Sequence, residues 1–207
     1  MKNIYILLFS FLCSLTSIAQ ETKFSTVKIE GFGSIGLPSN MEIQGGVYKE
    51  LSDRIKEING VNASKVIFQQ KNLNSLDGSS MQTYARVFIR TETGTAGDFK
   101  KLSEALTQAE ADEVNSTFKS QIESEAPRAN AKVLEWHKAI TSTLNGHNAI
   151  KYGYKRQIGT NKPVLVEVFM LQNNDRLHIV TFEYRLDDNN WSTTFTSIKT
   201  TVKITAK

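Results

Sequence analysis

Two of the three histidines lie near a carboxylate at a spacing that could support chemistry. Glu135 and His137 are two residues apart, so on a strand they would share a face, and His147 follows across the Asn145-Gly146 turn. Imidazoles grouped with a carboxylate suit metal ligation or general acid–base catalysis. The solvated end of a strand beside a hairpin would give the same pattern without any reaction.

Glu167 and His178 form a second candidate pair. If their segments make one hairpin, both side chains lie on the same face and could meet across it. A core histidine satisfied by a carboxylate or a carbonyl is the alternative explanation. We therefore predict no catalytic residue and no metal ligand. The competing hypothesis is a hydrolase or metal-dependent enzyme that uses Glu135/His137/His147 or Glu167/His178.

Signatures of other functions do not occur in the sequence. No serine lies in a Gly-x-Ser-x-Gly elbow, and the glycines form no phosphate-binding loop. Residues 72–78 are polar, but they do not follow the spacing of a calcium loop. Residues 84–90 alternate aromatic residues with arginines, as nucleic-acid platforms do, yet a strand packed under a helix reads the same way. We expect no cofactor, no metal and no nucleic-acid partner.

The elements that must position these residues centre on one predicted hairpin. Val164–Leu171 and Leu177–Tyr184 are rich in β-branched and aromatic residues, which predicts two strands. The Asn and Asp residues between them favour a turn centred on Asn173-Asn174 or on Asn174-Asp175. Apolar side chains occur on both faces, so we expect both faces of the sheet to be covered.

The other segments are expected to provide this cover. Phe24–Gly36, a turn at Leu37–Asn40 and Met41–Ile43 suggest an N-terminal hairpin. Helical spacing predicts helices over 47–58, over Asp98–Ala126 and over residues 187–198, the last with Trp191, Phe195 and Ile198 on its buried face. Thr107 and Glu110 have the spacing of a capping box, which would divide the middle helix and start its longer part near Gln108.

Further strands are expected at regular intervals. They are predicted over Lys65–Gln70, Gln82–Thr91, Ala131–Thr143, Ala149–Gln157 and Val202–Ile204. The Asn145-Gly146 pair marks a hairpin turn between the third and fourth of these segments.

The first twenty residues have the pattern of a secretory leader. Lys2 is followed by the apolar run Ile4–Leu15 and by small residues ending at Ala19. This run is shorter than the roughly 20 residues that span a membrane, and Cys13 within it is the single cysteine. We predict a signal peptide over residues 1–19, one domain over 20–207, and a periplasmic or secreted protein. The formal net charge of +4 gives no indication of an anionic partner.

The order of these elements resembles that of the PsbP-like fold family, which includes the extrinsic photosystem subunit and bacterial relatives. The resemblance rests on the N-terminal hairpin, the mid-chain helix, the Asn145-Gly146 hairpin, the strands ending at Tyr184, and the final helix and strand. It implies an α+β fold in which an antiparallel sheet is covered by helices on both faces, an α/β/α sandwich. It also implies a non-enzymatic binding or assembly module for an envelope protein or a small ligand.

Overall fold

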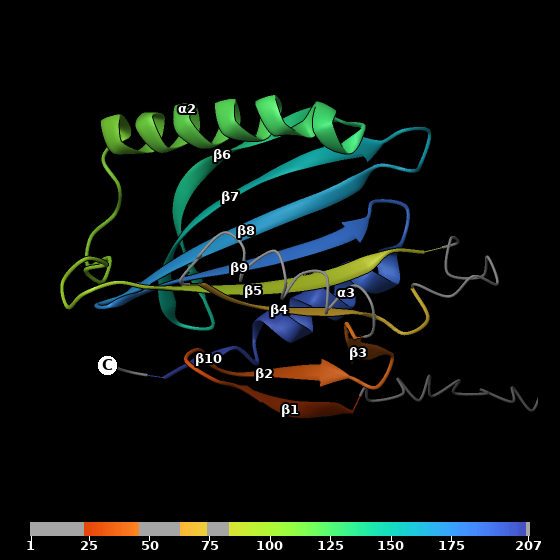
Figure 1. The fold of residues 1–207 in the computed structure, drawn as a ribbon, viewed down its shortest axis with the longest axis horizontal. Helices are drawn as coiled ribbons and strands as arrows, with labels where there is room; N and C mark the ends of the chain where they lie inside the picture. The colour runs from red at the N-terminus through yellow and green to blue at the C-terminus, as the bar shows by residue number, and fades with distance from the viewer. Residues whose placement is uncertain (1–22, 46–62, 74–82, 206–207) are drawn as a thin grey trace, which may run out of the picture.

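The computed structural model describes residues 23–45, 63–73 and 83–205. Within these ranges the chain forms two antiparallel sheets and two α-helices, so the predicted α+β class with an antiparallel sheet is confirmed (Figure 1). The predicted leader and the predicted helix over 47–58 lie outside the described residues. No helix in the described part of the chain has the length and apolarity needed to cross a bilayer.

The larger sheet has seven strands, and every neighbouring pair is antiparallel. In spatial order they are β3 (Met41–Ile43), β4 (Ala63–Gln70), β5 (Ala85–Thr93), β9 (Arg176–Arg185), β8 (Val164–Asn173), β7 (His147–Ile158) and β6 (Ala131–Leu144). The smaller sheet pairs β1 (Phe24–Ile29), β2 (Gly33–Pro38) and β10 (Lys203–Ile204). The hairpin that the sequence placed at the centre, β8–β9, therefore has strands on both sides.

The register of β8–β9 selects one of the two predicted turns. Asn173 pairs with Arg176, so the turn is centred on Asn174-Asp175, and Asn174 has a φ of 63°. The second predicted hairpin is also confirmed, because Leu144 pairs with His147 around Asn145 and Gly146. Asparagine tolerates the positive φ that such tight turns require.

One face of the β8–β9 hairpin packs towards helix α2 (Gln108–Glu125). Val166 and Val168 of β8 belong to a buried cluster with β7. Partly buried apolar residues from α2 and from the segment before it pack against this cluster: Leu102, Leu106, Val114, Phe118 and Ile122. The helix runs along β6 (Figure 1).

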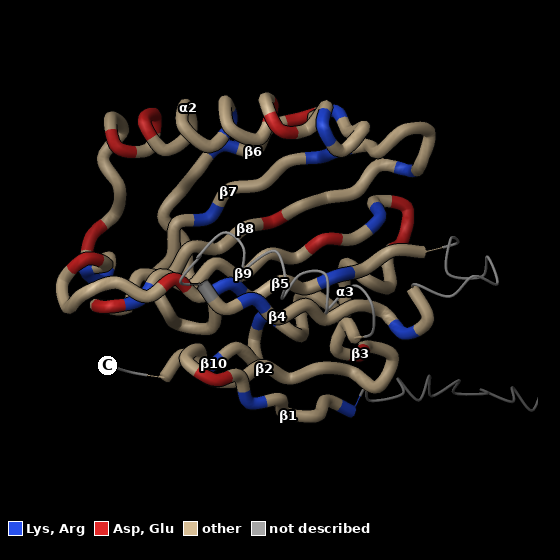
Figure 2. Tube along the Cα trace, in the orientation of Figure 1, with Lys and Arg blue, Asp and Glu red and all other residues tan. Residues whose placement is uncertain are grey.

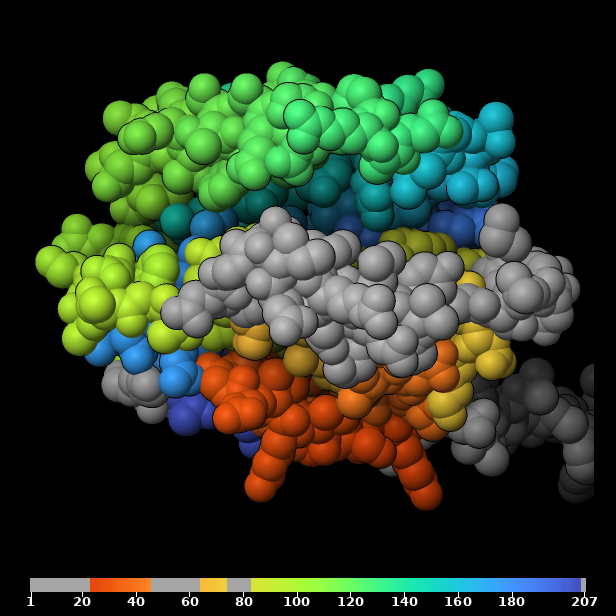
Figure 3. Space-filling view, viewed as in Figure 1, coloured from red at the N-terminus to blue at the C-terminus, as the bar shows by residue number. Residues whose placement is uncertain are grey.

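The opposite face is covered by helix α3 (Asn189–Lys199) together with the small sheet. Phe169 and Phe182 of the hairpin form one core with Phe195 of α3 and with Phe32 and Ile35 near β2. The helix contacts both β9 and β2, and in the space-filling view α2 and the small sheet lie at opposite margins of the molecule (Figure 3). A sheet thus supplies part of the cover that the sequence assigned to helices.

The N-terminal hairpin turns at a different place from the one predicted. The turn lies at Glu30–Phe32, between β1 and β2, whereas the chain after Pro38 leaves for the large sheet as β3. Gly33 explains the position of β2, because its φ is 140° and an added Cβ would lie 2.0 Å from the carbonyl oxygen of Lys203 in β10. Only glycine lets the two strands come this close.

The predicted helix over Asp98–Ala126 is helical only from Gln108 onward, so the capping-box alternative placed the start of the longer helix correctly, but the short helix that it put before this point is absent. The Thr107 hydroxyl accepts a hydrogen bond from the Glu110 N–H, and the Glu110 carboxylate accepts one from the Thr107 N–H. Before this cap the chain is not helical, and the Phe99 N–H donates to the Asn174 carbonyl at 2.8 Å. Leu102 and Leu106 of this non-helical segment pack against the core, and their four-residue spacing matches that of a helix although no helix forms.

Truncation of Phe195 tests the importance of the α3 cover. Its side chain is fully buried, so Phe195→Ala should lower the free energy of unfolding by about 3–5 kcal/mol, the usual cost of removing a buried aromatic ring. Urea denaturation followed by circular dichroism measures this change.

Thr193→Ala is the matched control, because Thr193 lies on the exposed side of the same helix. It should change the free energy of unfolding by less than about 0.5 kcal/mol. Equal effects of the two substitutions would contradict the packing of α3 described above.

Candidate functional site

The first predicted cluster comes together only in part. His137 Nε2 lies 3.1 Å from Glu135 Oε1, and the Lys155 ammonium lies 2.5 Å from Glu135 Oε2. The hydrogen bond from Lys155 is the main reason that the pKa of Glu135 is lowered. His147 begins β7, whereas His137 pairs with Gly153 in the middle of that strand, six residues away or about 20 Å at strand spacing. The three residues therefore do not share one site.

The second predicted pair is also separated. Glu167 pairs with Phe182, whereas His178 pairs with Leu171, so the two lie about 13 Å apart along the hairpin. Glu167 instead forms ion pairs with Lys151 and Lys199. Burial alone would raise the pKa of Glu167, but the hydrogen bonds from these two lysines outweigh it and lower the pKa.

His178 is a fully buried residue of the core. Its Nδ1 lies 3.0 Å from the Thr91 hydroxyl, and the Phe32 ring packs against it edge to face. Burial, and then the positive charge of Arg176, lower its pKa to about 4, so the imidazole is neutral near pH 7. Its polar neighbour is therefore a hydroxyl and not the predicted carboxylate. Among the described residues no three acidic, histidine or cysteine side chains are grouped as metal ligands.

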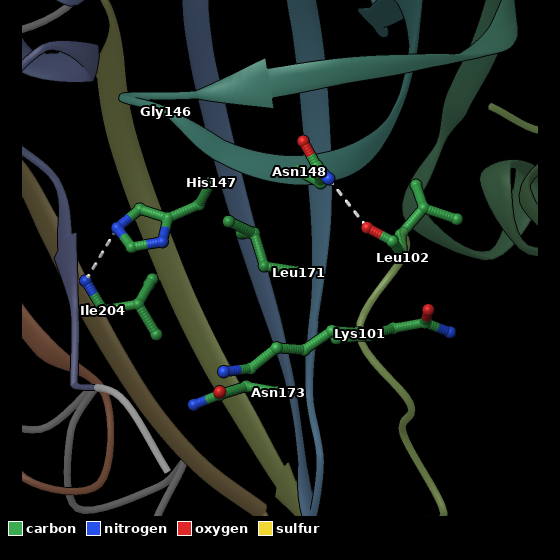
Figure 4. A pocket seen from close by; sticks show the side chains of 9 residues that line it. Lys101, Leu102, Gly146, His147, Asn148, Leu171, Asn173 and Ile204 are labelled. Carbon is green, nitrogen blue, oxygen red and sulfur yellow. Dashed lines mark hydrogen bonds between the residues drawn. The ribbon is translucent and has the colours of Figure 1, made fainter. Parts of the chain in front are cut away.

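His147 lines a pocket of about 310 Å³, here called the His147 pocket. Its other lining residues come from four chain segments, the end of β8 among them, that meet at one end of the large sheet: Lys101, Leu102, Gly146, Asn148, Leu171, Gln172, Asn173 and Ile204 (Figure 4). The pocket therefore joins the β6–β7 turn, the segment before α2, the end of β8 and the C-terminal strand.

The polar groups of the His147 pocket hold these segments together. The Ile204 N–H donates to His147 Nε2 at 3.4 Å, and the Asn148 amide donates to the Leu102 carbonyl at 2.7 Å (Figure 4). The Asn173 amide donates to the Thr205 carbonyl at 3.0 Å. Groups with these partners contribute to stability, because each satisfies a backbone donor or acceptor that would otherwise lack a partner.

A second pocket, of about 330 Å³, lies at the opposite end of the sheet and is here called the arginine pocket. Val164 at the start of β8 lines it, whereas Asn173 at the end of β8 lines the His147 pocket. The complete lining is Leu73, Thr83, Tyr84, Arg156, Ile158, Thr160, Asn161, Lys162, Val164 and Arg185. Three of these residues are cationic and none carries a carboxylate.

A buried hydrogen-bond network fixes Arg156 at this pocket. Its Nη2 donates to Glu183 Oε2 at 2.7 Å, and the Tyr84 hydroxyl donates to the same oxygen at 2.6 Å. Glu183 is only 7% exposed, so water cannot solvate its charge, and the two donors take the place of water. Burial, and then the Glu183 charge, raise the pKa of the Tyr84 hydroxyl, which keeps it a donor.

The sequence did not identify these three residues as a site. They lie on β5, β7 and β9, or beside them, and the Arg156 side chain reaches Glu183 across β8. The pairings of Arg156 with Val164 and of Glu183 with Val166 bring them together. Charge density along the chain gives no clue, since acidic and basic residues are spread over both sheets and helices (Figure 2). The one available signal was Glu183 itself, because a carboxylate among the apolar residues of β9 indicates a buried charge that needs a partner.

Comparisons with known proteins identify a similar fold. No family model matches the chain, and no curated protein sequence matches it. Among solved structures, the solution structure of cyanobacterial PsbP (CyanoP) from Synechocystis sp. PCC 6803 matches with a TM-score of 0.48 at 14% identity. The match covers 94% of this chain and 99% of that chain. The match transfers no functional residue to this chain.

The lowered pKa of His178 predicts a loss of stability in acid. The unfolded chain takes up the His178 proton near pH 6.5 and the folded chain only near pH 4. Between these values the unfolded state binds more protons, so the free energy of unfolding falls as the pH is lowered. Replacement by His178→Gln should reduce this fall by about 3 kcal/mol between pH 7 and pH 4. Urea titrations of both proteins at each pH measure it.

The Thr193→Ala variant is the control, because it removes no titratable group and Thr193 lies on the exposed side of α3. It should keep the acid dependence of the native protein. An unchanged pH dependence in the His178 variant would show that the pKa of this imidazole is the same in the folded and unfolded states.

Proposed function

We propose that the chain is an exported, non-catalytic binding module of the cell envelope, with the arginine pocket as its ligand site. The observation that carries the proposal is the fixed position of Arg156. Its bond to buried Glu183 holds the guanidinium in place before any ligand arrives. Binding then requires little ordering of that side chain, which favours affinity.

The size and lining of the arginine pocket support the binding of a small molecule. A volume of about 330 Å³ is at the lower end of the range for small-molecule sites, which are mainly apolar with a few placed polar groups. Leu73, Ile158 and Val164 provide apolar surface, and hydroxyl, amide and cationic side chains provide the polar groups.

The alternative hydrolase or metal-dependent enzyme is less well supported. A general base must lie within hydrogen-bond reach of its proton, directly or through one water. Glu135 and His137 meet, but both are partly exposed and Glu135 is neutralised by Lys155. Glu167 is neutralised by two lysines and is far from His178. These pairings favour roles in stability and solubility.

The proposal includes export and a variant of the α/β/α sandwich. Residues 1–19 would act as the signal peptide and residues 20–207 as the single mature domain, in the periplasm or outside the cell. The small sheet would stand beside α3 in one of the two covering layers. A mature domain without Cys13 would need its apolar core for stability, since it could form no disulfide.

Export predicts the N-terminus of the mature protein. Expressed with its leader in a Gram-negative host, the protein recovered from the periplasm or medium should begin at Gln20, as measured by intact mass and N-terminal sequencing. Ala19→Arg should block processing, because the peptidase reads small residues there. A mature chain that retains Met1 and stays in the cytosol would contradict export.

Ligand binding predicts stabilisation that depends on the arginine pocket. In a thermal-shift screen of small neutral, cationic and anionic compounds, a ligand at 100 times its Kd should raise the Tm by roughly 5–11 °C. Thr160→Trp should abolish this shift, because Thr160 is exposed at the pocket and an indole there would fill it.

Thr143→Trp is the matched control, since Thr143 is an exposed strand residue outside the arginine pocket. It should leave the shift unchanged. If no compound stabilises the native chain, or if the hits stabilise the Thr160 variant equally, the arginine pocket is not the binding site.

A further inference from the structure

The arginine pocket has more positive than negative charges around it, and this imbalance indicates which class of ligand it would bind. Arg156 and Arg185 each pair with a carboxylate outside the lining, Glu183 and Asp187 respectively. Lys162 adds a third cation, which makes no ion pair or hydrogen bond within the described residues but is attracted at longer range by the Asp187 charge. Behind the lining, Arg86 lies over the Tyr84 ring and Asp188 accepts from Thr83, so these two further charges offset each other. The pocket keeps an excess positive charge.

The hydrogen-bond donors of the pocket divide into used and unused groups. The Tyr84 hydroxyl donates to Glu183, and the Thr83 hydroxyl donates to Asp188 while it accepts from the Trp191 indole. Arg156 makes its bonds through Nη2. The Thr160 hydroxyl and the Lys162 ammonium lie on the β7–β8 loop and make no hydrogen bond within the described part of the chain. The Thr160 hydroxyl and the Lys162 ammonium can therefore donate hydrogen bonds to an acceptor group of a ligand.

We infer that the arginine pocket binds a small organic carboxylate with a compact apolar body. The inference rests on the function proposed above and adds the chemical class of the ligand. The carboxylate is held beside Lys162 and Arg156, where charge-assisted hydrogen bonds are about twice as strong as neutral ones. The apolar body contacts Leu73, Ile158 and Val164. A guanidinium fixed in position suits this task, because its planar fork matches a carboxylate.

The test compares three probes that separate charge from shape. Cyclohexanecarboxylate carries both proposed features, cyclohexanecarboxamide has the same shape without charge, and inorganic phosphate has charge without an apolar body. Isothermal titration calorimetry of the mature chain measures each Kd. We expect the carboxylate to bind at least tenfold more tightly than either comparator, and more weakly as sodium chloride is raised, because salt screens exposed charges.

Trp191 provides a second readout at the site. The chain has two tryptophans, and the Trp191 indole donates to the Thr83 hydroxyl, a lining group of the pocket, at 3.0 Å. In a Trp136→Phe background the emission is that of Trp191 alone. Its change should saturate at the carboxylate concentration that calorimetry gives, whereas carboxamide at that concentration should leave it unchanged.

Two single-charge variants locate the carboxylate. Lys162→Gln removes an exposed cation from the pocket, and Lys119→Gln removes one from α2, where Lys119 pairs with Glu123. We expect Lys162→Gln to weaken carboxylate binding at least threefold and Lys119→Gln to leave it unchanged. Arg156→Lys, which keeps the charge but loses the fork, should weaken it further, and circular dichroism verifies that each variant is folded.

The failures of the two proposals are distinguishable. If acid and amide bind equally and Thr160→Trp abolishes both, the carboxylate inference is wrong while the pocket remains a binding site. Equal losses in the Lys162 and Lys119 variants would show a non-specific charge effect and overturn the inference. Tight binding of phosphate would remove the role of the apolar wall. If none of the probes binds, the inference is wrong, and the thermal-shift screen decides separately whether the pocket binds any ligand.

Discussion

The structure depends on the burial of both faces of the β8–β9 hairpin. Val166 on one face and Phe182 on the other are almost inaccessible to water, so each face needs its own cover. Helix α2 and the segment before it cover the first, and α3 with the small sheet covers the second. Burial of apolar surface contributes about 25 cal/mol per Å², and the hairpin contributes residues to both clusters, as the neighbouring strands β6 and β7 also do.

The same burial produces the arginine pocket and its fixed cation. Glu183 is part of β9, and it points to the face that α2 partly covers, where an isolated carboxylate would be strongly disfavoured. Tyr84, just before β5, and Arg156, which reaches across β8 from β7, both donate to it and satisfy it. A network of this kind is weak support for stability, because desolvation offsets its attraction. It does hold a guanidinium in one position at the end of the sheet, which is useful for recognition.

Local patterns in the sequence were sufficient for much of the fold. The Asn145-Gly146 turn, the two apolar faces of the hairpin, the Thr107–Glu110 cap and the Trp191, Phe195 and Ile198 stripe of α3 are all set by residues close together in the chain. The small sheet was not predictable in this way. Its last strand has two residues, and it pairs with β2 from the other end of the chain.

The candidate site was beyond sequence reasoning for a related reason. The histidines drew attention because their chemistry is distinctive, but strand register pairs His137 of β6 with Gly153, six residues along β7 from His147. Nothing in the local sequence distinguishes Tyr84, Arg156 and Glu183, and only the pairing of the strands brings them together around β8. Phe99, Leu102 and Leu106 show the opposite error. Their spacing is typical of a helix, but the segment is not helical, and its leucines pack individually against the core.

The central claim is that the β8–β9 hairpin is the best-protected part of the core. Native-state amide hydrogen exchange, followed by NMR on the isotope-labelled mature chain, tests it directly. The amides of Val166–Val168 and Val180–Phe182 should exchange only through global unfolding, with an opening free energy equal to that from urea denaturation. If these amides exchange through local openings while the edge strand β6 remains more protected, the hairpin is not the element on which the fold depends.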